Sequence, residues 1–343
     1  MKKILVRATN WIGDAVMSLP ALAAIRASFP KAEIAVLARP WVADIYARQS
    51  AIDRVIPYRA ARGAHDLGAK WDLAKQLRAE AFDCAILLQN AFEAALLVKL
   101  AGIPKRIGYD RDGRGWLLTD AIAIPQPGEI PRHQSFYYLE LLRRAGMLEA
   151  LPETQTIRLD GIDQAIARGA LRFAELGAAL PVIGVSPGAA YGGAKRWMAD
   201  GFVEAASSIA LHESASVALF GSETERPLCD AIAGSISARG AAVINLAGRT
   251  TLREFIDLAA ACRLFLTNDS GAMHIASALG VRTVAVFGAT DDIATGPTGP
   301  LARVVRQDVD CSPCLLRECP IDHRCMTRVT PDRVAAVAMD LLR

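Results

Sequence analysis

The stretch LFLTNDSGAMHIASALG, residues 264–280, shows the repeating unit of the fold. Its first four residues, 264–267, are apolar or β-branched and predict a buried strand. A polar turn follows, and from Ser270 onward apolar residues recur at helical spacing until Gly280, a residue suited to end a helix. A strand that leads directly into a helix is the unit from which α/β sheets are built.

The same alternation runs through most of the chain and falls into two series. Alternating strands and helices imply parallel sheets with helices on both faces, so we expect two doubly wound domains, residues 1–165 and 166–343, with a final helix over 331–343. Ligands bind at the carboxyl ends of the strands in such sheets, and a cleft between two halves is the natural site. Apolar segments predict strands at residues 4–6, 34–37, 54–56, 84–88, 182–185, 216–220, 264–267 and 283–287.

The composition indicates a folded protein of the cytoplasm. Hydrophobic residues make up 52% of the 343 residues and charged residues 22%, which is enough apolar material for two cores. The net charge of +3 is too small to favour a nucleic-acid partner. No apolar stretch approaches the roughly 18 residues that span a bilayer. The first apolar run stops at Arg7, too early for a signal peptide, so we expect a cytoplasmic protein with reduced thiols.

The loop after the first expected strand contains Asn10, Trp11, Gly13 and Asp14. Gly13 allows the backbone to turn or to approach a ligand closely. Asp14 stands at the start of a helix, where an aspartate commonly caps the free N–H groups. The same position, at the carboxyl end of a strand, suits a general base that takes a proton from an attacking hydroxyl. The residues alone leave both interpretations open.

A glycine-rich loop, residues 186–197, follows the first strand of the second series. Gly188 and Gly193 have the separation of a P-loop, but Lys195 comes one residue late and Arg196 stands where that motif has Ser or Thr. A lysine in such a loop still suits a diphosphate, because its ammonium is a compact positive charge. The alternative is a flexible loop with solvated basic side chains.

Two further turns follow strands of the second series. Glu225 is placed to accept hydrogen bonds from ribose hydroxyls, as acidic groups do in dinucleotide folds, although a solvated charge accounts for it equally well. The other turn is more specific, because four polar or small residues meet at one helix start, where free N–H groups and the helix dipole favour an anion. These residues are Asp269, Ser270, Gly271 and His274.

Basic residues of the first domain are candidates for binding an anionic acceptor, although most surface cations only increase solubility. They are Arg59, Arg62, Lys105, Arg106, Arg111 and Arg114.

Four of the seven cysteines are clustered near the end of the chain, at Cys311, Cys314, Cys319 and Cys325, with His323 between them. This spacing suits a tetrahedral zinc ion with a structural role. An iron–sulfur centre, disulfides and reduced thiols are the alternatives, and disulfides are disfavoured in the cytoplasm.

Taken together, these segments resemble glycosyltransferase family 9, the ADP-heptose:lipopolysaccharide heptosyltransferases, over nearly the whole chain. The resemblance rests on residues 13–20, 187–197 and 268–274. Residues 101–108 and 189–197 are more similar to the heptosyltransferase II branch than to heptosyltransferase I. Heptosyltransferase I has a pair of threonines where this chain has Ala190-Tyr191, so the resemblance does not extend phosphate contacts to these two side chains.

The resemblance implies a GT-B fold of two Rossmann-like domains, with the acceptor on the N-terminal domain and ADP-heptose on the C-terminal one. It implies inverting transfer of L-glycero-D-manno-heptose to the first heptose of the inner core, on heptosyl-Kdo-lipid A. No cofactor is required for such transfer, and the enzyme would contact the cytoplasmic face of the inner membrane peripherally.

The resemblance also assigns roles to residues. Asp14 matches the general base, Lys195 the lysine that contacts the diphosphate, and Glu225 the glutamate that binds ribose. The remaining donor-site candidates are Gly188, Arg196, Asp269, Ser270, Gly271 and His274, and those for the acceptor are Asn10, Trp11, Lys105, Arg106 and Arg111.

Alternatives to this function are a heptosyltransferase with a different acceptor, another GT-B nucleotide-sugar enzyme such as an epimerase, and a nucleotide-sugar-binding or scaffold protein without activity. A zinc-dependent nucleic-acid module built on the cysteines is a further alternative, which the net charge of +3 disfavours.

Overall fold

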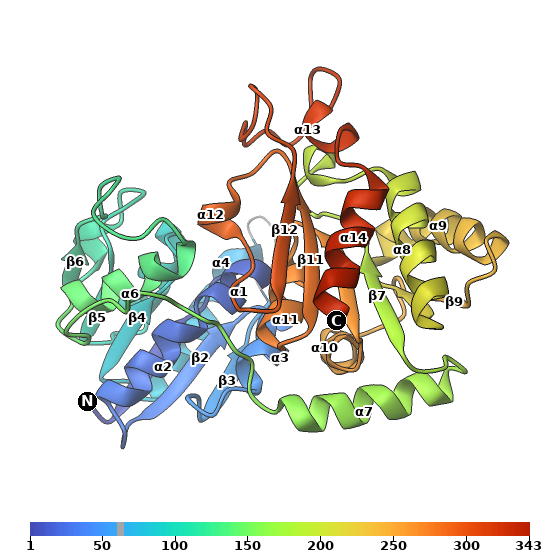
Figure 1. Cartoon of the computed structure of the whole chain (residues 1–343). Helices are drawn as coiled ribbons and strands as arrows, with labels where there is room; N and C mark the ends of the chain where they lie inside the picture. The colour runs from blue at the N-terminus through green and yellow to red at the C-terminus, as the bar shows by residue number, and fades with distance from the viewer. Residues whose placement is uncertain (60–64) are drawn as a thin grey trace. The chain divides into compact units, whose positions relative to one another are not determined.

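The computed structural model describes residues 1–59 and 65–343 and divides into two compact units, Met1–Gln155 and Thr156–Arg343 (Figure 1). The division comes before the boundary expected at residue 165. The reason is that residues just after 155 already bond within the second unit. The N–H of Ile157 donates to Thr298 Oγ1 at 3.0 Å, and the N–H of Leu159 donates to the Ala278 carbonyl at 3.0 Å.

The first unit is a six-stranded parallel sheet with the strand order β3-β2-β1-β4-β5-β6, which is the Rossmann order. After the loop that follows β1, two consecutive helices meet at Ser18. Pro20 lies in the first turn of the second helix, where its missing N–H costs no hydrogen bond. The strands are β1 (Lys3–Arg7), β2 (Glu33–Ala38), β3 (Arg54–Pro57), β4 (Cys84–Leu87), β5 (Lys105–Tyr109) and β6 (Asp120–Ile122). The helices are α1 (Ile12–Met17), α2 (Leu19–Ser28), α3 (Pro40–Ala47), α4 (His65–Ala79), α5 (Phe92–Leu100), η1 (Gly115–Leu117) and α6 (Gln134–Arg144).

The second unit repeats this architecture. Its parallel sheet has the order β12-β11-β10-β7-β8-β9, which is again the Rossmann order when counted from β7. The strands are β7 (Val182–Ser186), β8 (Ser216–Leu219), β9 (Val243–Asn245), β10 (Leu264–Asn268), β11 (Arg282–Phe287) and β12 (Ala302–Arg306). The helices are α7 (Ile162–Glu175), η2 (Gly193–Lys195), α8 (Ala199–Glu213), η3 (Glu223–Glu225), α9 (Arg226–Ala238), α10 (Leu252–Ala260), α11 (Gly271–Ala278), α12 (Asp292–Thr295), α13 (Arg324–Thr327) and α14 (Pro331–Leu342).

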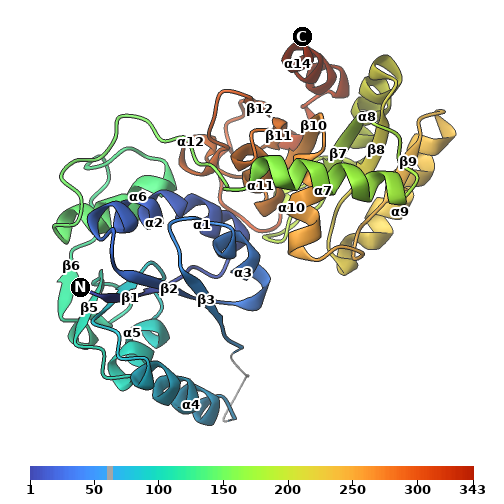
Figure 2. The ribbon, with the colours of Figure 1, turned by 90° about the horizontal axis from the view of Figure 1, so that it is seen from below.

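Helices cover both faces of the second sheet, as Figure 2 shows from below. Alternate residues of β10 face opposite ways, so Leu264 and Leu266 join the core formed with α8, α9 and α14. Phe265 points to the other face, where its ring centroid lies 6.1 Å from that of Phe255 on α10. Burial of both faces explains why the strand reads as a continuous apolar run rather than an alternating one.

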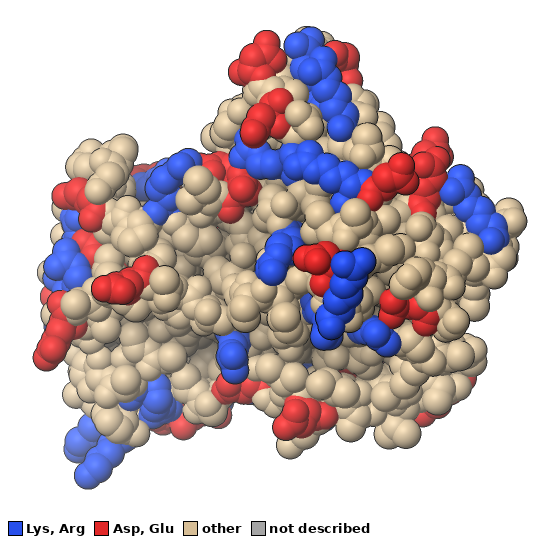
Figure 3. All heavy atoms as spheres, in the orientation of Figure 1, with Lys and Arg blue, Asp and Glu red and all other residues tan. Residues whose placement is uncertain are grey.

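The surface has no dominant sign of charge on the face drawn in Figure 3, where acidic and basic side chains are interspersed. This distribution agrees with the net charge of +3. Within residues 1–59 and 65–343, no helix combines the length and the apolar character that crossing a membrane requires.

Candidate active site

The second sheet brings most of the expected donor-site residues together at its topological switch point. β7 and β10 are neighbours in the sheet, and their chains continue toward opposite sides. Ligands of doubly wound sheets bind at this position, outside the carboxyl ends of the strands. The loop after β7, residues 187–197, is called the glycine loop below, and it lies beside the turn after β10.

Asn268, the last residue of β10, holds the glycine loop at both ends. Its side chain is fully buried. The Oδ1 atom accepts the N–H of Trp197 at 2.9 Å, and the Nδ2 atom donates to the carbonyl of Pro187 at 2.7 Å. Asn268 was not among the expected site residues. The signal in the sequence was its position, directly after the predicted strand 264–267 and directly before the polar turn that begins at Asp269.

Lys195 and Asp269 form a close ion pair at the start of this turn. Lys195 Nζ lies 2.6 Å from Asp269 Oδ2, and the two side chains are only 15% and 5% exposed. Thr290, after β11, donates its hydroxyl to the same carboxylate oxygen at 2.6 Å. The ammonium also lies 5.0 Å from the ring centroid of Tyr191. The lysine that sequence suggested for an anion is thus held in one place by a carboxylate and an aromatic face.

The start of α11 adds N–H groups to this site. Ser270 caps the helix, since its hydroxyl accepts the N–H of Met273 at 3.4 Å, and Thr267 Oγ1 lies 3.0 Å from the same hydroxyl. Gly271 is the first residue of the helix, and His274 is buried within the first turn. The turn therefore offers a helix N-terminus beside the Lys195 ammonium, an arrangement that favours a negatively charged group.

Glu225 and Gly188 lie against each other. One Glu225 oxygen, Oε2, accepts both the N–H and the hydroxyl of Ser222 at 2.8 Å, so the glutamate completes a capping box at η3. A Cβ atom on Gly188 would overlap Glu225 Oε1, so the glycine permits the carboxylate to approach the loop. Glu225 is therefore half-buried beside the site instead of being a freely solvated charge.

Arg196 does not turn toward the Lys195–Asp269 pair. Its guanidinium is exposed, and it donates to the carbonyl of Ala189 at 3.4 Å within the same loop.

Asp14 lies in the first turn of α1, at the carboxyl end of β1. The N-cap of this helix is Trp11, which makes no side-chain cap hydrogen bond, so of the two interpretations left open for Asp14 the N-cap role is not the one observed. Asp14 is half-buried. Burial raises the pKa of the nearby Tyr138 hydroxyl well above its usual range, and the Asp14 charge raises it further. The Tyr138 hydroxyl near Asp14 is therefore held in its neutral form.

In the sequence, Arg7 marks only the end of the first apolar run. In the structure its side chain connects Asn10, in the loop after β1, with Tyr58, in the loop after β3. The side chain is 2% exposed, and burial lowers its pKa to about 10. It donates to Asn10 Oδ1 at 3.2 Å and to the hydroxyl of Tyr58. The Asn10 carbonyl in turn accepts the indole N–H of Trp41 at 2.8 Å. Trp11 is left 61% exposed beside this network.

Most of the basic acceptor candidates are used elsewhere. Lys105 and Arg106 open β5 at its amino end, away from the edge where ligands bind. Lys105 pairs with Asp120 at 3.7 Å, and Arg106 donates to the carbonyl of Leu117 at 2.8 Å.

The other arginines of this group differ in exposure. Arg114 is fully buried and donates to Asn90 Oδ1 at 3.1 Å, so it supports the fold. Arg111 is exposed after β5 and lies 3.7 Å from Asp112, and Arg59 is also exposed. Arg62 lies outside the described residues.

The four clustered cysteines lie in the segment 311–325, called the cysteine segment below, and all are free thiols. Burial raises the pKa of Cys325, and the charges of Cys311, Cys314 and Cys319 raise it further. Across residues 1–59 and 65–343, however, no three His, Cys, Asp or Glu side chains are arranged as a metal site. The present side-chain arrangement therefore does not fit a bound ion.

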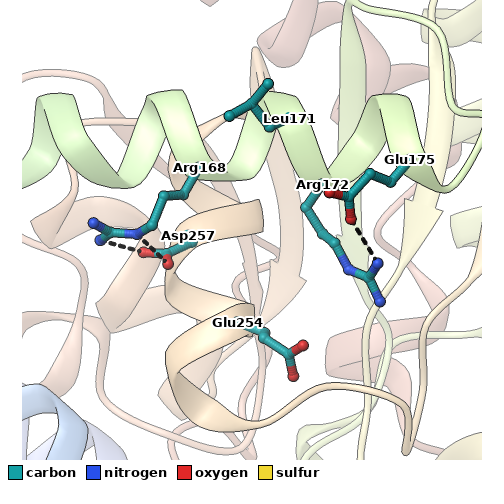
Figure 4. A pocket seen from close by; sticks show the side chains of 6 residues that line it. All are labelled: Arg168, Leu171, Arg172, Glu175, Glu254 and Asp257. Carbon is teal, nitrogen blue, oxygen red and sulfur yellow. Dashed lines mark hydrogen bonds and ion pairs between the residues drawn. The ribbon is translucent and has the colours of Figure 1, made fainter.

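A surface pocket between α7 and α10 contains none of these site residues (Figure 4). Arg168 Nε lies 2.8 Å from Asp257 Oδ2, and Arg172 Nη1 lies 2.8 Å from Glu175 Oε2. At Gly169 a Cβ atom would collide with the Asp257 carbonyl, so the two helices are in close backbone contact. The pocket therefore lies at the edge of the contact between α7 and α10, where mostly charged side chains line it.

Comparison with known proteins agrees with this geometry. The model of glycosyltransferase family 9 (heptosyltransferase) matches residues 70–324. Lipopolysaccharide heptosyltransferase 2 of Salmonella typhimurium is 33% identical over 310 residues, which cover 89% of this chain and 88% of that protein. The solved structure of E. coli ADP-heptose LPS heptosyltransferase II is 30% identical, with a TM-score of 0.84 over 100% of this chain and 98% of that one.

A more distant structure, E. coli heptosyltransferase WaaC with ADP, is 17% identical and has a TM-score of 0.75 over 99% of both chains, so it shares the fold. These similarities confirm the expected GT-B fold.

Proposed function

Because the chain belongs to glycosyltransferase family 9 (heptosyltransferase) and is a glycosyltransferase, we propose that it transfers heptose from ADP-heptose to the first heptose of the lipopolysaccharide inner core. The names of its relatives support the donor and the pathway: one is a lipopolysaccharide heptosyltransferase 2, and one is an ADP-heptose LPS heptosyltransferase II. The observation that carries the proposal is the Lys195–Asp269 pair at the start of α11.

On the donor side, Lys195 and the N–H groups at the start of α11 bind the diphosphate of ADP-heptose. When the diphosphate enters, Lys195 exchanges part of its interaction with Asp269 for the phosphate oxygens. Negative charge grows on the diphosphate as the bond to the anomeric carbon breaks, and fixed positive groups stabilise that charge. Asp269 and His274 serve the donor sugar, and Glu225 serves the ribose.

On the acceptor side, Asp14 is the general base. The acceptor hydroxyl oxygen forms a bond to the anomeric carbon, the bond from that carbon to the diphosphate breaks, and the hydroxyl proton moves to the Asp14 carboxylate. ADP leaves with the electron pair of the broken bond. Attack from the face opposite the diphosphate inverts the configuration at the anomeric carbon.

This chemistry requires no metal ion or other cofactor, since an ammonium and helix N–H groups supply the positive charge. A zinc ion at the cysteine segment would have a structural role only. It would need the cysteine side chains to move from their present arrangement, because four thiolates must converge on one point.

The natural acceptor, heptosyl-Kdo-lipid A, would place the enzyme peripherally at the cytoplasmic face of the inner membrane. Two alternatives within the GT-B fold are a heptosyltransferase with a different acceptor and a nucleotide-sugar epimerase.

The test measures both ADP release and conversion of the donor sugar, starting from ADP-heptose with heptosylated Kdo-lipid A, with unheptosylated Kdo-lipid A and with no acceptor. Release only with the heptosylated acceptor is the expected result. Release only with the unheptosylated acceptor assigns a different acceptor, and conversion of the sugar without any acceptor favours the epimerase.

The Asp14→Asn variant tests the base. The variant is expected to bind ADP-heptose with a Kd within about twofold of the wild type, because the proposed donor residues Lys195 and Asp269 belong to the other unit of the chain. Its turnover is expected to fall roughly 10²- to 10⁴-fold. The half-buried Asp44 on α3 of the same unit offers a matched control, and Asp44→Asn should leave turnover unchanged. Near-normal turnover of Asp14→Asn would overturn the assignment.

A further inference from the structure

We infer that the cysteine segment positions the glycine loop, and with it Lys195, for binding the donor diphosphate, and that Glu318 is a positioning residue. The inference rests on the proposed role of Lys195 as the diphosphate ligand.

The segment bonds to the glycine loop immediately before Lys195. The N–H of Ala194 donates to the Arg317 carbonyl at 2.9 Å, and the N–H of Gly193 donates to Glu318 Oε1 at 2.9 Å. Two further hydrogen bonds connect the same stretches, His323 Nε2 to the Ala194 carbonyl at 3.0 Å and Tyr191 Oη to the Leu315 carbonyl at 3.1 Å.

The glycines of the loop fit this contact. At Gly192 a Cβ atom would overlap the Arg317 carbonyl, and at Gly193 it would overlap Glu318 Oε2. The backbone of Gly192 is extended, a conformation open to any residue, so the close approach and not the backbone angle requires glycine there.

This contact changes how the loop can bind phosphate. In a P-loop, successive backbone N–H groups surround the phosphates. Here the N–H groups of Gly193 and Ala194 are already bonded to the cysteine segment. Recognition of the diphosphate by this part of the loop therefore depends on the Lys195 side chain and on where the segment holds it.

The segment is itself fixed to the end of β11. Ser312 Oγ donates to the Gly288 carbonyl at 2.6 Å, and the N–H of Leu315 donates to the Ala289 carbonyl at 2.8 Å. The buried Cys325 Sγ would lie 2.8 Å from a Cβ atom on Gly288. Thr290, which follows Ala289 in the chain, donates its hydroxyl to the Asp269 carboxylate. The chain after β11 thus positions both partners of the ion pair, Asp269 through Thr290 and Lys195 through the cysteine segment. Figure 1 shows this segment as the irregular connection between β12 and α13.

The experiment compares Glu318→Ala, Glu318→Gln and Lys195→Ala in the full chain, with Glu204→Ala as control. Glu204 is an exposed glutamate of the same unit with one ion pair at 3.9 Å to Arg239. The measurements are the Kd for ADP, the KM for ADP-heptose and for the acceptor, and the melting temperature.

Because Glu318 is exposed and water partly replaces it, loss of its hydrogen bond predicts that Glu318→Ala weakens ADP binding and raises the donor KM about threefold. The acceptor KM and the melting temperature should stay at the values of Glu204→Ala, because Glu318 is exposed. Glu318→Gln keeps an oxygen that accepts the Gly193 N–H, so it should restore most of the ADP affinity.

Gly192→Ala provides an independent variant, since its new Cβ atom displaces the Arg317 carbonyl and should raise the donor KM in the same way. The inference is overturned if Glu318→Ala binds ADP like Glu204→Ala, or if it raises both KM values equally. If the wild type does not bind ADP, or if Lys195→Ala binds it normally, the proposed function fails instead. Loss of ADP affinity in Lys195→Ala but not in Glu318→Ala refutes only the positioning role.

Discussion

Replacement of Asn268 by Ala is expected to release the glycine loop at both ends. The side chain is fully buried, accepts the N–H of Trp197 at 2.9 Å and donates to the carbonyl of Pro187 at 2.7 Å. An alanine side chain can make neither of these hydrogen bonds. Trp197 is itself only 3% exposed, so water has little access to its freed N–H.

The magnitude follows from the two backbone groups that lose their partners. A buried polar group without a partner costs about 1–3 kcal/mol, so the free energy of unfolding of the second unit should fall by about 2–6 kcal/mol. For a domain of this size, a loss of about 3 kcal/mol lowers the melting temperature by roughly 6–12 °C. The donor KM should rise as well, because Lys195 lies on the same loop.

Thermal and urea unfolding of the full chain measure the loss, with Asn245→Ala as the matched control. Asn245 also stands at the end of a strand of this sheet and makes two hydrogen bonds, to Asp230 at 2.7 Å and from the Ala247 N–H at 2.9 Å. It is half-buried, so water replaces its partners and the cost should be only about 0.5–1.5 kcal/mol. If Asn268→Ala unfolds no more easily than Asn245→Ala, the view that Asn268 fixes the loop is refuted.

Two further predictions concern the cysteines and acid stability. A thiol reagent applied to the native protein should modify the exposed Cys314 first and the buried Cys325 only on unfolding, because burial raises the pKa of Cys325 and blocks access. If Cys314 instead reacts with the reagent only after a chelator is added, and metal analysis finds zinc, the cysteines bind an ion. Hydrogen bonds from Arg143 and Arg144 lower the pKa of Glu140 below its ordinary 4.5, so its contribution to stability is present above that pH and is lost as the pH falls through the lowered value. Glu140→Gln should therefore be less stable at pH 7 and show a shallower acid dependence in urea unfolding; an unchanged acid limb would contradict this.

The fold was predictable where strands are buried on both faces. All eight strands expected from apolar runs are present, since a short apolar run between helical segments is typical of a strand in a parallel sheet. Among residues 1–59 and 65–343, four strands were missed. β5 begins with Lys105 and Arg106, whose charges obscure the buried part of the strand. β6, β9 and β12 lie at sheet edges. β6 and β9 are only three residues long, and in β12 arginines flank the two valines, so none of the three shows a clear apolar run.

The candidate site was predictable where a side chain lies in the loop or turn that follows a strand. Asp14, Lys195 and Asp269 all lie at carboxyl ends of strands, as their positions in the sequence indicated. Arg7 was missed because its role depends on a hydroxyl from another strand end, that of Tyr58. Lys105 and Arg106 were proposed from charge alone, and charge does not indicate the end of a strand at which a residue lies.

The glycine loop shows the limit of motif reasoning most directly. A glycine indicates that something approaches the backbone closely, but the pattern does not tell whether that is a ligand or another part of the chain. At Gly193 it is Glu318, which lies 125 residues away in the sequence. The P-loop-like spacing of Gly188 and Gly193 thus has two separate causes, the approach of Glu225 at the first position and of Glu318 at the second. Because both neighbours are carboxylates, the loop backbone faces negative charge at both glycines, and Lys195 is left as the group of this loop suited to a diphosphate.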